Sequence, residues 1–487
     1  MKLQALAALL TLISVTNARE FKGRHAHLNK RQAPASSSTT ATSAAGATSS
    51  STSATGAATS AATSAATSAA GAATSAAAAP VGTYAATDIL PLSSITSGMP
   101  TLPTLAVPTT FSAGASPPVS GAPVLPTPFV FKPGTWPAQD KVPETDTDEV
   151  KEWLKELDGF DIPDLTPSAD GSCVGDPAAA ADAANRGWWT CGGHTRPTDI
   201  VACPDKMTWG VSFDDGPSPY TLTLLNYLDQ KDLKATFFVV GSRVIERPQV
   251  LVEEYMSGHE ISVHTWSHRP LTSLTNEQIV AELGWTRKAI KTVLGITPTT
   301  MRPPYGDIDD RVRAISLAMG MVPIIWTSSP SGIPFDTNDW RVAGGLVTGP
   351  QSFETFQGIL GNASTMDTGF IVLQHDLYQI TVELATGYTL DAAMNHNPPF
   401  TLKAIGDCSD IPVTDLYRET TTNTSFPYTN TSDANSDTSA ATSGSPSSSR
   451  GNGSNTSGAS RGAIEHAIPG LSIILAASVL VLGGSLF

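Results

Sequence analysis

Short apolar runs alternate with stretches of helical periodicity between about residues 199 and 405. Five of the runs have the length and the Val, Ile and Phe content typical of strands, at 207–213, 235–241, 259–264, 321–326 and 370–374. A helix over 217–229 carries leucines on one face, and another begins after Thr275, where Gln278 completes a capping box. This alternation predicts an α/β fold of parallel strands and crossover helices, with the site at the C-terminal ends of the strands.

Polar side chains follow three of these runs directly. Asp214 and Asp215 follow the first run, His264 and His268 follow the third, and His375 follows the last. In a barrel of parallel strands the C-terminal ends share one face, so we expect these side chains to meet there.

Two histidines and a carboxylate are a ligand set that suits a zinc ion with an open position for water. His264 and His268 are four residues apart and can face one ion from a single helical turn, while the acidic pair supplies the third ligand. Adjacent acids point to different sides, so we expect one to bind metal and the other to handle protons. Two alternatives remain open: the histidines are ordinary surface or core residues, or one acid caps the helix that begins at Pro217.

Five short motifs stand in order along this region: Ser-Phe-Asp-Asp-Gly at 212–216, His-Thr-Trp-Ser-His at 264–268, Arg-Pro-Pro-Tyr-Gly at 302–306, Asp-Thr-Asn-Asp-Trp at 336–340 and Leu-Gln-His at 373–375. Together they resemble the motifs of the NodB-homology polysaccharide deacetylases, carbohydrate esterase family four, and those of fungal chitin deacetylases in particular. The resemblance covers about 200 of the 487 residues. It implies a distorted (β/α) barrel of the NodB type. Ser212 stands where the first motif usually has Thr, a change that leaves the chemistry untouched.

The resemblance implies a metal-dependent hydrolase. Asp215, His264 and His268 would hold Zn²⁺ or another divalent metal such as Co²⁺. Asp214 would be the general base that takes a proton from the attacking water, and His375 the general acid that protonates the departing amine. The implied reaction removes the N-acetyl groups of N-acetylglucosamine units in chitin and gives chitosan and acetate.

Four further residues have implied supporting roles. Arg302 would orient the base, and Asp339 would partner the acid. The backbone N–H of Tyr305 would hold the oxyanion, and Trp340 would pack against the site as part of the substrate-binding surface. Three other aromatic residues, Trp266, Tyr220 and Trp285, either line a sugar groove or are buried.

Other functions compete with this interpretation. Peptidoglycan and xylan deacetylases share the motifs, so the substrate is less determined than the chemistry. A glycosidase would use two carboxylates that flank a bond, but Asp214 and Asp215 are adjacent in the chain and two motif histidines would have no role. A non-catalytic cell-wall mannoprotein would account for the flanking segments but not for the complete set of motifs.

The flanks of this region differ sharply in composition. The segments that we expect are a signal peptide (1–18), a propeptide ending at a dibasic pair (19–31), a low-complexity Ser/Thr/Ala/Pro stalk (32–136), an N-terminal extension of the catalytic region (137–198), the deacetylase domain (199–418), a Ser/Thr/Asn-rich spacer (419–460) and a glycosylphosphatidylinositol (GPI) anchor signal that is removed (461–487). The Ser/Thr-rich flanks lack the apolar residues to form a core, so they are expected to be disordered. The anchor would attach at Asn455, Ser457 or Gly458. A transmembrane helix is the alternative for the tail.

Cysteines, sequons and charge complete the prediction. Four cysteines in a secreted chain favour two disulfides, and we expect Cys173–Cys191 and Cys203–Cys408, the second because it would tie together the ends of the domain. N-glycosylation sequons lie at Asn362, Asn423, Asn430, Asn452 and Asn455. A net charge of −15 excludes nucleic acid as a general partner. The expected partners are chitin or N-acetylglucosamine oligomers and cell wall polysaccharide. The chain would reach the cell wall and the outer face of the plasma membrane through its lipid anchor alone.

Overall fold

The computed structural model describes residues 89–108 and 111–426. The expected signal peptide, propeptide and anchor signal lie outside the described residues, as do the sequons at Asn430, Asn452 and Asn455. Among the helices of the described part, none has the length and apolar character needed to cross a bilayer.

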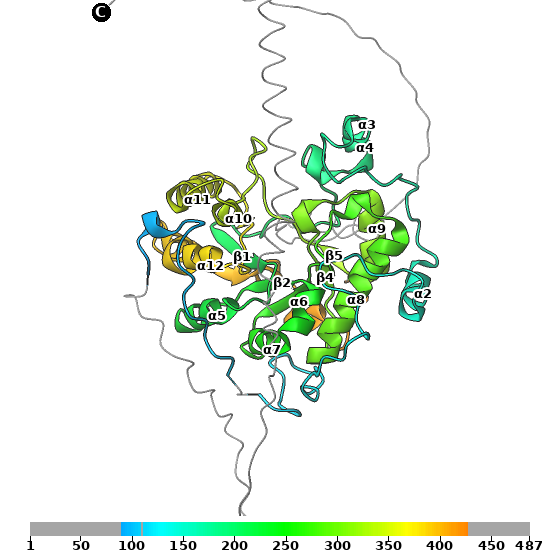
Figure 1. The fold of residues 1–487 in the computed structure, drawn as a ribbon. Helices are drawn as coiled ribbons and strands as arrows, with labels where there is room; N and C mark the ends of the chain where they lie inside the picture. Colours follow the sequence, from blue (N-terminus) through cyan, green and yellow to red (C-terminus); the bar gives the residue numbers. More distant parts are fainter. Residues whose placement is uncertain (1–88, 109–110, 427–487) are drawn as a thin grey trace, which may run out of the picture. The chain divides into compact units, whose positions relative to one another are not determined.

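Seven parallel strands form the centre of the described part (Figure 1). They are β1 (Thr208–Asp214), β2 (Thr236–Val239), β3 (Glu260–Val263), β4 (Thr300–Met301), β5 (Val322–Pro323), β6 (Phe370–Ile371) and β7 (Thr401–Ala404). The order is β5-β4-β3-β2-β1-β6, and β7 pairs with the first half of β1. Five of these strands lie within the predicted apolar runs or one residue beyond them, whereas β4 and β7 were not predicted.

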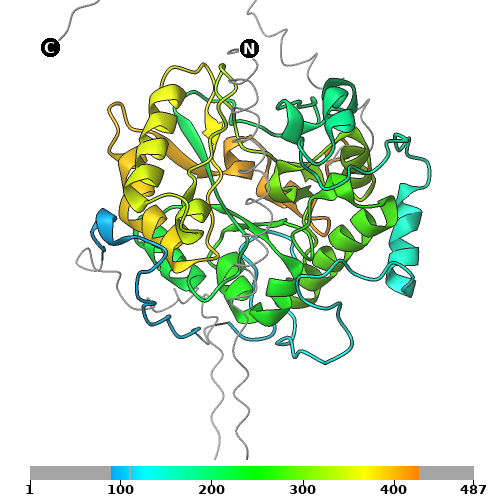
Figure 2. The ribbon, with the colours of Figure 1, turned by 45° about the horizontal axis from the view of Figure 1, so that its top comes forward.

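The sheet curls back so that its two edges meet. Beyond β5, the N–H of Thr327 donates to the carbonyl of Ile371 in β6 (3.0 Å), and the N–H of Ile371 donates to Thr327 Oγ1 (2.9 Å). The segment 335–337 adds to the closure, since the N–H of Leu373 donates to the carbonyl of Phe335 (2.8 Å) and the N–H of Thr337 donates to the carbonyl of Leu373 (3.2 Å). The ring closes through such short pairings, so the barrel is irregular at this seam. Figure 2 shows the helices arranged around the central strands. The predicted α/β fold, a distorted barrel, is confirmed.

The helices of the described part are α2 (Asp148–Leu154), α3 (Pro177–Ala181), α4 (Ala183–Arg186), α5 (Thr221–Gln230), α6 (Gly241–Glu246), α7 (Pro248–Met256), α8 (Asn276–Leu294), α9 (Asp310–Ala318), α10 (Asp339–Ala343), α11 (Gly349–Ala363), α12 (Gln379–Leu384), α13 (Leu390–Met394) and α14 (Ile405–Cys408). The predicted capping box of α8 is present: Thr275 accepts from the N–H of Gln278, and Gln278 accepts from the N–H of Thr275. α5 begins later than predicted, because Pro217 and Ser218 form the turn that leads into it.

The core lies inside the barrel and between the strands and the helices. Every residue of β1 and β2 is buried, as expected for parallel strands that are covered on both faces. Trp209, Phe213 and Phe237 are fully buried and pack in stacked or tilted contacts with neighbouring aromatic rings. This packing holds the strand ends, and therefore the polar residues that follow them, in fixed positions.

The predicted stalk over 32–136 is wrong for its described part, residues 89–108 and 111–136. Ile95 is fully buried against Val342 and Leu384, and Val119 and Leu125 belong to the main core. A Pro-rich segment has no strand or helix periodicity. Its sequence therefore gives no pattern from which to predict the single apolar side chains that it buries. The described part of the stalk is therefore packed on the domain.

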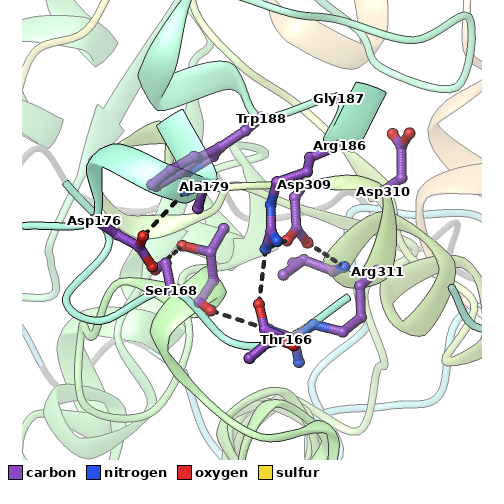
Figure 3. A network of polar contacts seen from close by, with 12 residues as sticks. Thr166, Ser168, Asp176, Ala179, Arg186, Gly187, Trp188, Asp309, Asp310 and Arg311 are labelled. Carbon is purple, nitrogen blue, oxygen red and sulfur yellow. Dashed lines mark hydrogen bonds and ion pairs between the residues drawn. The ribbon is translucent and has the colours of Figure 1, made fainter. Parts of the chain in front are cut away.

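The N-terminal extension, residues 137–198, is also packed closely on the barrel. Arg186 donates to the carbonyl of Thr166 (2.9 Å) and to Asp309 Oδ2 (3.1 Å), and this buried network is shown in Figure 3. Both expected disulfides are present: Cys173–Cys191 lies within the extension, and Cys203–Cys408 joins the segment before β1 to α14.

The domain continues past the predicted end at residue 418. Glu419 accepts from the N–H (2.6 Å) and hydroxyl (2.8 Å) of Thr297. Two sequons lie in the described part: Asn362 is half-exposed in the last turn of α11, and Asn423 is exposed and donates to Asp415 Oδ2 (3.1 Å). Their glycosylation stays a prediction.

Candidate active site

The polar residues predicted to converge do so at the C-terminal ends of the strands. Asp214 ends β1, His264 follows β3, and Arg302 follows β4. Beyond β6, His375 lies in parallel register with Asp214, and the N–H of Asp214 donates to the carbonyl of Gln374 (3.0 Å). The backbone pairing of neighbouring strands therefore brings acids and histidines from distant parts of the chain to one face.

Asp215, His264 and His268 form a group that could hold a metal ion, with their ligand atoms within 4.8 Å of one another. Asp215 Oδ1 lies 3.0 Å from His268 Nε2 and 3.5 Å from His264 Nε2. All three side chains are buried, and Asp215 Oδ1 receives no hydrogen bond. A buried carboxylate oxygen that faces two ring nitrogens is a donor set suited to a divalent cation such as zinc.

The surroundings prepare these ligands for a cation. His264 Nδ1–H donates to the carbonyl of Arg302 (2.8 Å), which leaves Nε2 as the atom that faces Asp215. Burial opposes ionisation of Asp215, but the neighbouring His268, His264 and Arg243 hold its pKa well below the ordinary value. Burial also lowers the pKa of His268, against the opposing effect of Asp215. A deprotonated carboxylate and neutral imidazoles are the forms that bind metal.

Asp214 is held by a buried arginine. Arg302 Nη1 lies 2.6 Å from Asp214 Oδ1 and 3.0 Å from Ser212 Oγ, and its guanidinium lies 3.9 Å from the centre of the Phe238 ring. The Arg302 side chain is fully buried, so this ion pair is shielded from water and salt. The other oxygen of Asp214, Oδ2, lies 3.9 Å from His264 Nε2, so the carboxylate borders the metal-binding group.

His375 and Asp339 form a second buried pair. His375 Nδ1 lies 2.8 Å from Asp339 Oδ1, and the backbone N–H of His375 donates to Asp339 Oδ2 (2.8 Å). Burial alone would lower the pKa of His375, but the carboxylates of Asp339, Asp215 and Asp214 together raise it to about 10. This imidazole is therefore held in its protonated form.

Tyr305 and Trp340 lie beside these groups. The Tyr305 ring stands edge-on to His268, with 4.7 Å between ring centres. Trp340 is buried at the start of α10, where its N–H donates to Asp339 Oδ1 (2.7 Å) and its indole donates to Asp336 Oδ2 (3.4 Å).

Backbone strain is concentrated at this face. Nine residues other than glycine have a positive φ in the described part, and five of them belong to the motifs: Asp215 (79°), Thr265 (64°), His268 (55°), Tyr305 (62°) and Asn338 (58°). Each such residue costs of order 1–3 kcal/mol and persists only where the surrounding structure enforces it. The strain is a second, independent sign that this face is the functional one.

Two charged residues of the site were missed by sequence reasoning. Arg243 in α6 donates to the carbonyl of Asp215 (2.6 Å) and lies 3.7 Å from Asp215 Oδ1. Glu282 in α8 accepts from the N–H groups of Trp266 and Ser267, both at 2.8 Å, and so holds the loop between the two histidines. Both lie inside amphipathic helices, where a lone charge has no distinguishing pattern.

Two of the aromatic residues left open by the sequence lie inside the protein. Trp266 is fully buried, and Trp285 is 4% exposed and lines a pocket together with Trp136 and Lys288. Trp136 lies parallel to Trp266 with ring centres 6.1 Å apart, and it meets Trp285 edge-on at 5.7 Å. These rings form a packed cluster behind the histidine loop. Tyr220 is partly buried and packs against the core.

Residues 202–324 match the family model described as polysaccharide deacetylase. Over 336 residues the chain is 54% identical to chitin deacetylase 1 of Cryptococcus neoformans var. grubii, an alignment that covers 68% of this chain and 70% of that protein. The chain belongs to the polysaccharide deacetylase family.

Other relatives are more distant. Chitin deacetylase 1 of Saccharomyces cerevisiae is 37% identical over 38% of this chain and 57% of its own length. Among solved structures, the chitin deacetylase from Colletotrichum lindemuthianum aligns with 47% of this chain and 99% of that chain, at 24% identity and a TM-score of 0.41. The peptidoglycan deacetylase PdaC from Bacillus subtilis aligns with 43% of this chain and 92% of that chain, at 27% identity and a TM-score of 0.35.

Proposed function

We propose that this chain hydrolyses the N-acetyl groups of N-acetylglucosamine units in chitin and releases acetate, leaving chitosan. The observation that carries the proposal is the arrangement of Asp214 and His375, one paired with a buried arginine and the other with a buried carboxylate, beside the group that could hold a metal. A carboxylate base and a protonated imidazole are the two proton-transfer groups that amide hydrolysis requires. The curated relatives named above are chitin deacetylases, which supports chitin as the polymer.

The cation in this proposal is Zn²⁺ or a similar divalent ion such as Co²⁺, held by Asp215, His264 and His268. When bound, such an ion makes a water more acidic and polarises the acetamide carbonyl. The hydrogen bond from His264 to the carbonyl of Arg302 supports this assignment, because it orients the ring of His264 with Nε2 toward the cation.

Proton transfer is assigned to two side chains. Asp214 takes a proton from the attacking water, since the ion pair with Arg302 fixes the orientation of its carboxylate. His375 gives its proton to the amine that leaves, because Asp339 holds the imidazole in its charged form and in one orientation. Arg302 and Asp339 are thus positioning residues for the base and the acid.

The oxyanion and the sugar are assigned to two further residues. The backbone N–H of Tyr305 donates to the oxygen that becomes negative during attack. Trp340 forms part of the surface that packs against the substrate, next to Asp339 at the start of α10.

The same chemistry distinguishes this proposal from glycoside hydrolysis. Glycosidases place two carboxyl groups about 5–9.5 Å apart on either side of the bond. Here the two adjacent acids have other partners and do not flank a bond: Asp214 pairs with Arg302, and Asp215 faces the two histidines. Chain shortening without acetate release would favour the glycosidase.

The place of action is the cell wall and the outer face of the plasma membrane, reached by secretion and a GPI anchor. This part of the proposal rests on the composition of residues 1–31 and 461–487. The fungal sources of the relatives agree with a chitin-containing wall as the setting.

Acetate release from N-acetylglucosamine oligomers tests the proposal. The secreted protein would be assayed as purified, after a chelator, and after zinc is added back. Release that the chelator stops and zinc restores is the expected result. Deacetylation of xylan or peptidoglycan but not of the oligomers would overturn the substrate while keeping the mechanism, and no release from any of them would favour the wall-protein alternative.

A further inference from the structure

Three consecutive residues of the extension, Trp188 to Thr190, contact the turn that carries Tyr305; these contacts are called the clasp below. This segment lies N-terminal to residues 202–324, the part that matches the family model, and nothing in the motifs assigns it a function. It overlaps the short 3₁₀ helix Trp189–Cys191, which packs on the 3₁₀ turn Pro304–Gly306.

The two segments make both hydrogen bonds and apolar contacts. Trp188 Nε1 and Thr190 Oγ1 both donate to Asp307 Oδ1, at 2.8 and 2.7 Å, and the N–H of Trp189 donates to the carbonyl of Ile308 (3.0 Å). The ring of Trp189 lies on the backbone of Gly306, so closely that a Cβ at that glycine would be 2.6 Å from Trp189 Cε3.

Asp307 extends this contact to the loop beyond His268. Its Oδ2 accepts from the N–H (2.9 Å) and the hydroxyl (2.7 Å) of Thr272. The carboxylate is fully buried, and it therefore joins the extension, the Tyr305 turn and the segment after the second histidine. A buried acid with four donors is a strong geometric constraint.

Tyr305 needs such a constraint. Its φ is 62°, in the left-handed region, and the next residue, Gly306, has a φ of 66°. Two consecutive residues in this region are unfavourable for the chain by itself, so the direction of the Tyr305 N–H depends on what packs against the turn.

The extension is itself rigidly attached near this contact. Cys173–Cys191 closes the end of the 3₁₀ helix, and Arg313 donates to the carbonyl of Gly187 (2.5 Å), the residue before Trp188. Arg313 is fully buried and is also paired with Asp199 (2.8 Å). The clasp is thus anchored on both sides.

We propose that Trp189 is a positioning residue: it holds the Tyr305 turn in the strained conformation in which its backbone N–H meets the oxyanion. The extension is then a working part of the active site rather than a linker. This inference rests on the proposed deacetylation for its kinetic consequence but not for its structural one.

The kinetic test compares Trp189→Ala with Trp189→Phe in the full-length protein. Because oxyanion contacts act in the transition state, Trp189→Ala should lower kcat for acetate release about 10- to 100-fold with KM within about twofold of wild type. Trp189→Phe keeps a flat ring against Gly306 and should recover most of kcat. A raised KM with kcat retained would mean that Trp189 contacts the sugar, and would overturn the inference.

The structural test is hydrogen exchange of peptides that cover residues 302–308. Trp189→Ala should speed exchange there, and Thr190→Val, which removes one hydrogen bond to Asp307, should do so to a smaller degree if the larger change fails to fold. The matched control is Trp153→Ala, a half-buried tryptophan that precedes the domain and packs on Trp285 instead. Unchanged exchange in both test variants, or equal change in the control, would overturn the inference. This readout applies even to a chain that deacetylates nothing, so the two proposals fail separately.

Discussion

The carboxylate of Asp339 binds His375 twice, through the ring Nδ1 (2.8 Å) and through the backbone N–H (2.8 Å). One side chain therefore fixes both the rotation of the imidazole and the path of the main chain that carries it. The pair is buried, so the charge of the carboxylate acts on the ring with little screening.

Asp339→Asn should move the basic limb of the pH profile of kcat to lower pH. The raised pKa of His375 keeps the general acid protonated below about 10, and activity is lost as the pH rises through that value. Removing the carboxylate charge lowers this pKa, by about 1–2 units if the charge-assisted hydrogen bond contributes about 1.5–3 kcal/mol. The profile of initial rates measures the shift. Asp336→Asn, in the same motif, serves as the comparison and should move the limb less, and equal shifts would contradict the assignment.

Asp214→Asn should abolish most activity without unfolding the protein. The amide cannot take a proton from water, so kcat should fall about 10²- to 10⁴-fold, as expected for loss of a general base. Asp214 is not among the three metal-binding residues, and cation affinity should be kept within a few-fold. Steady-state kinetics and a zinc titration check the two halves. Unchanged activity would falsify the mechanism.

Zinc should stabilise the wild-type protein but not His268→Ala. A cation at 100 times its dissociation constant adds about 2.7 kcal/mol of stability, because it binds only the folded state. Without His268 the group keeps one carboxylate and one imidazole, and the rise in Tm with zinc should be lost. The matched histidine control is His396→Ala: the Nδ1–H of His396 donates to the carbonyl of Pro398 (2.9 Å), and its ring packs against Phe400. A full rise in Tm for His268→Ala would place the cation elsewhere.

Loss of Cys203–Cys408 should destabilise the domain more than loss of Cys173–Cys191. The first closes a loop with a sequence separation of 205 residues and the second one of 18. Loop-closure entropy predicts about 5 kcal/mol for the longer loop and about 3 kcal/mol for the shorter. Free energies of unfolding of the two Cys→Ser double variants give the comparison. The reverse order would show that native-state contacts, not chain entropy, dominate.

Trp136→Ala should destabilise the domain although it lies in the predicted stalk. Its ring is half-buried between Phe129, Trp266 and Trp285, so the expected loss is about 2 kcal/mol, below the range for a fully buried tryptophan. Chemical denaturation measures it. Phe131, which is 51% exposed in the same segment, offers the control, and Phe131→Ala should change stability by less than about 0.5 kcal/mol. Equal effects would indicate that this segment is not anchored.

Much of the site could be predicted because its signals are local. Asp214 and Asp215 directly follow a buried strand, the two histidines are four residues apart, and each motif is a run of a few residues. Parallel strands then bring these runs to one face, so the order of motifs along the chain was sufficient to predict the convergence. The capping box at Thr275 was found for the same reason, since its partners are three residues apart.

Residues missed by the sequence act across long separations. Glu282 reaches the histidine loop from 15 residues away, and Trp188 reaches Asp307 from 119. Neither residue differs in sequence pattern from an ordinary helix charge or a buried aromatic. The described part of the stalk failed as a prediction for a related reason: an extended Pro-rich segment buries one side chain at a time, with no period to detect.

By itself the sequence determined which groups carry the chemistry, because residue type and short spacing define an acid, an imidazole pair or a cap. The tertiary structure alone decided contacts that the sequence did not indicate: the hydrogen bonds of Asp307 with Trp188, Thr190 and Thr272, the packing of Trp189 on Gly306, and the burial of Trp266. The physical reason is that these contacts depend on packing between segments that meet only after folding. Their energies belong to the packed protein and not to any local stretch of chain.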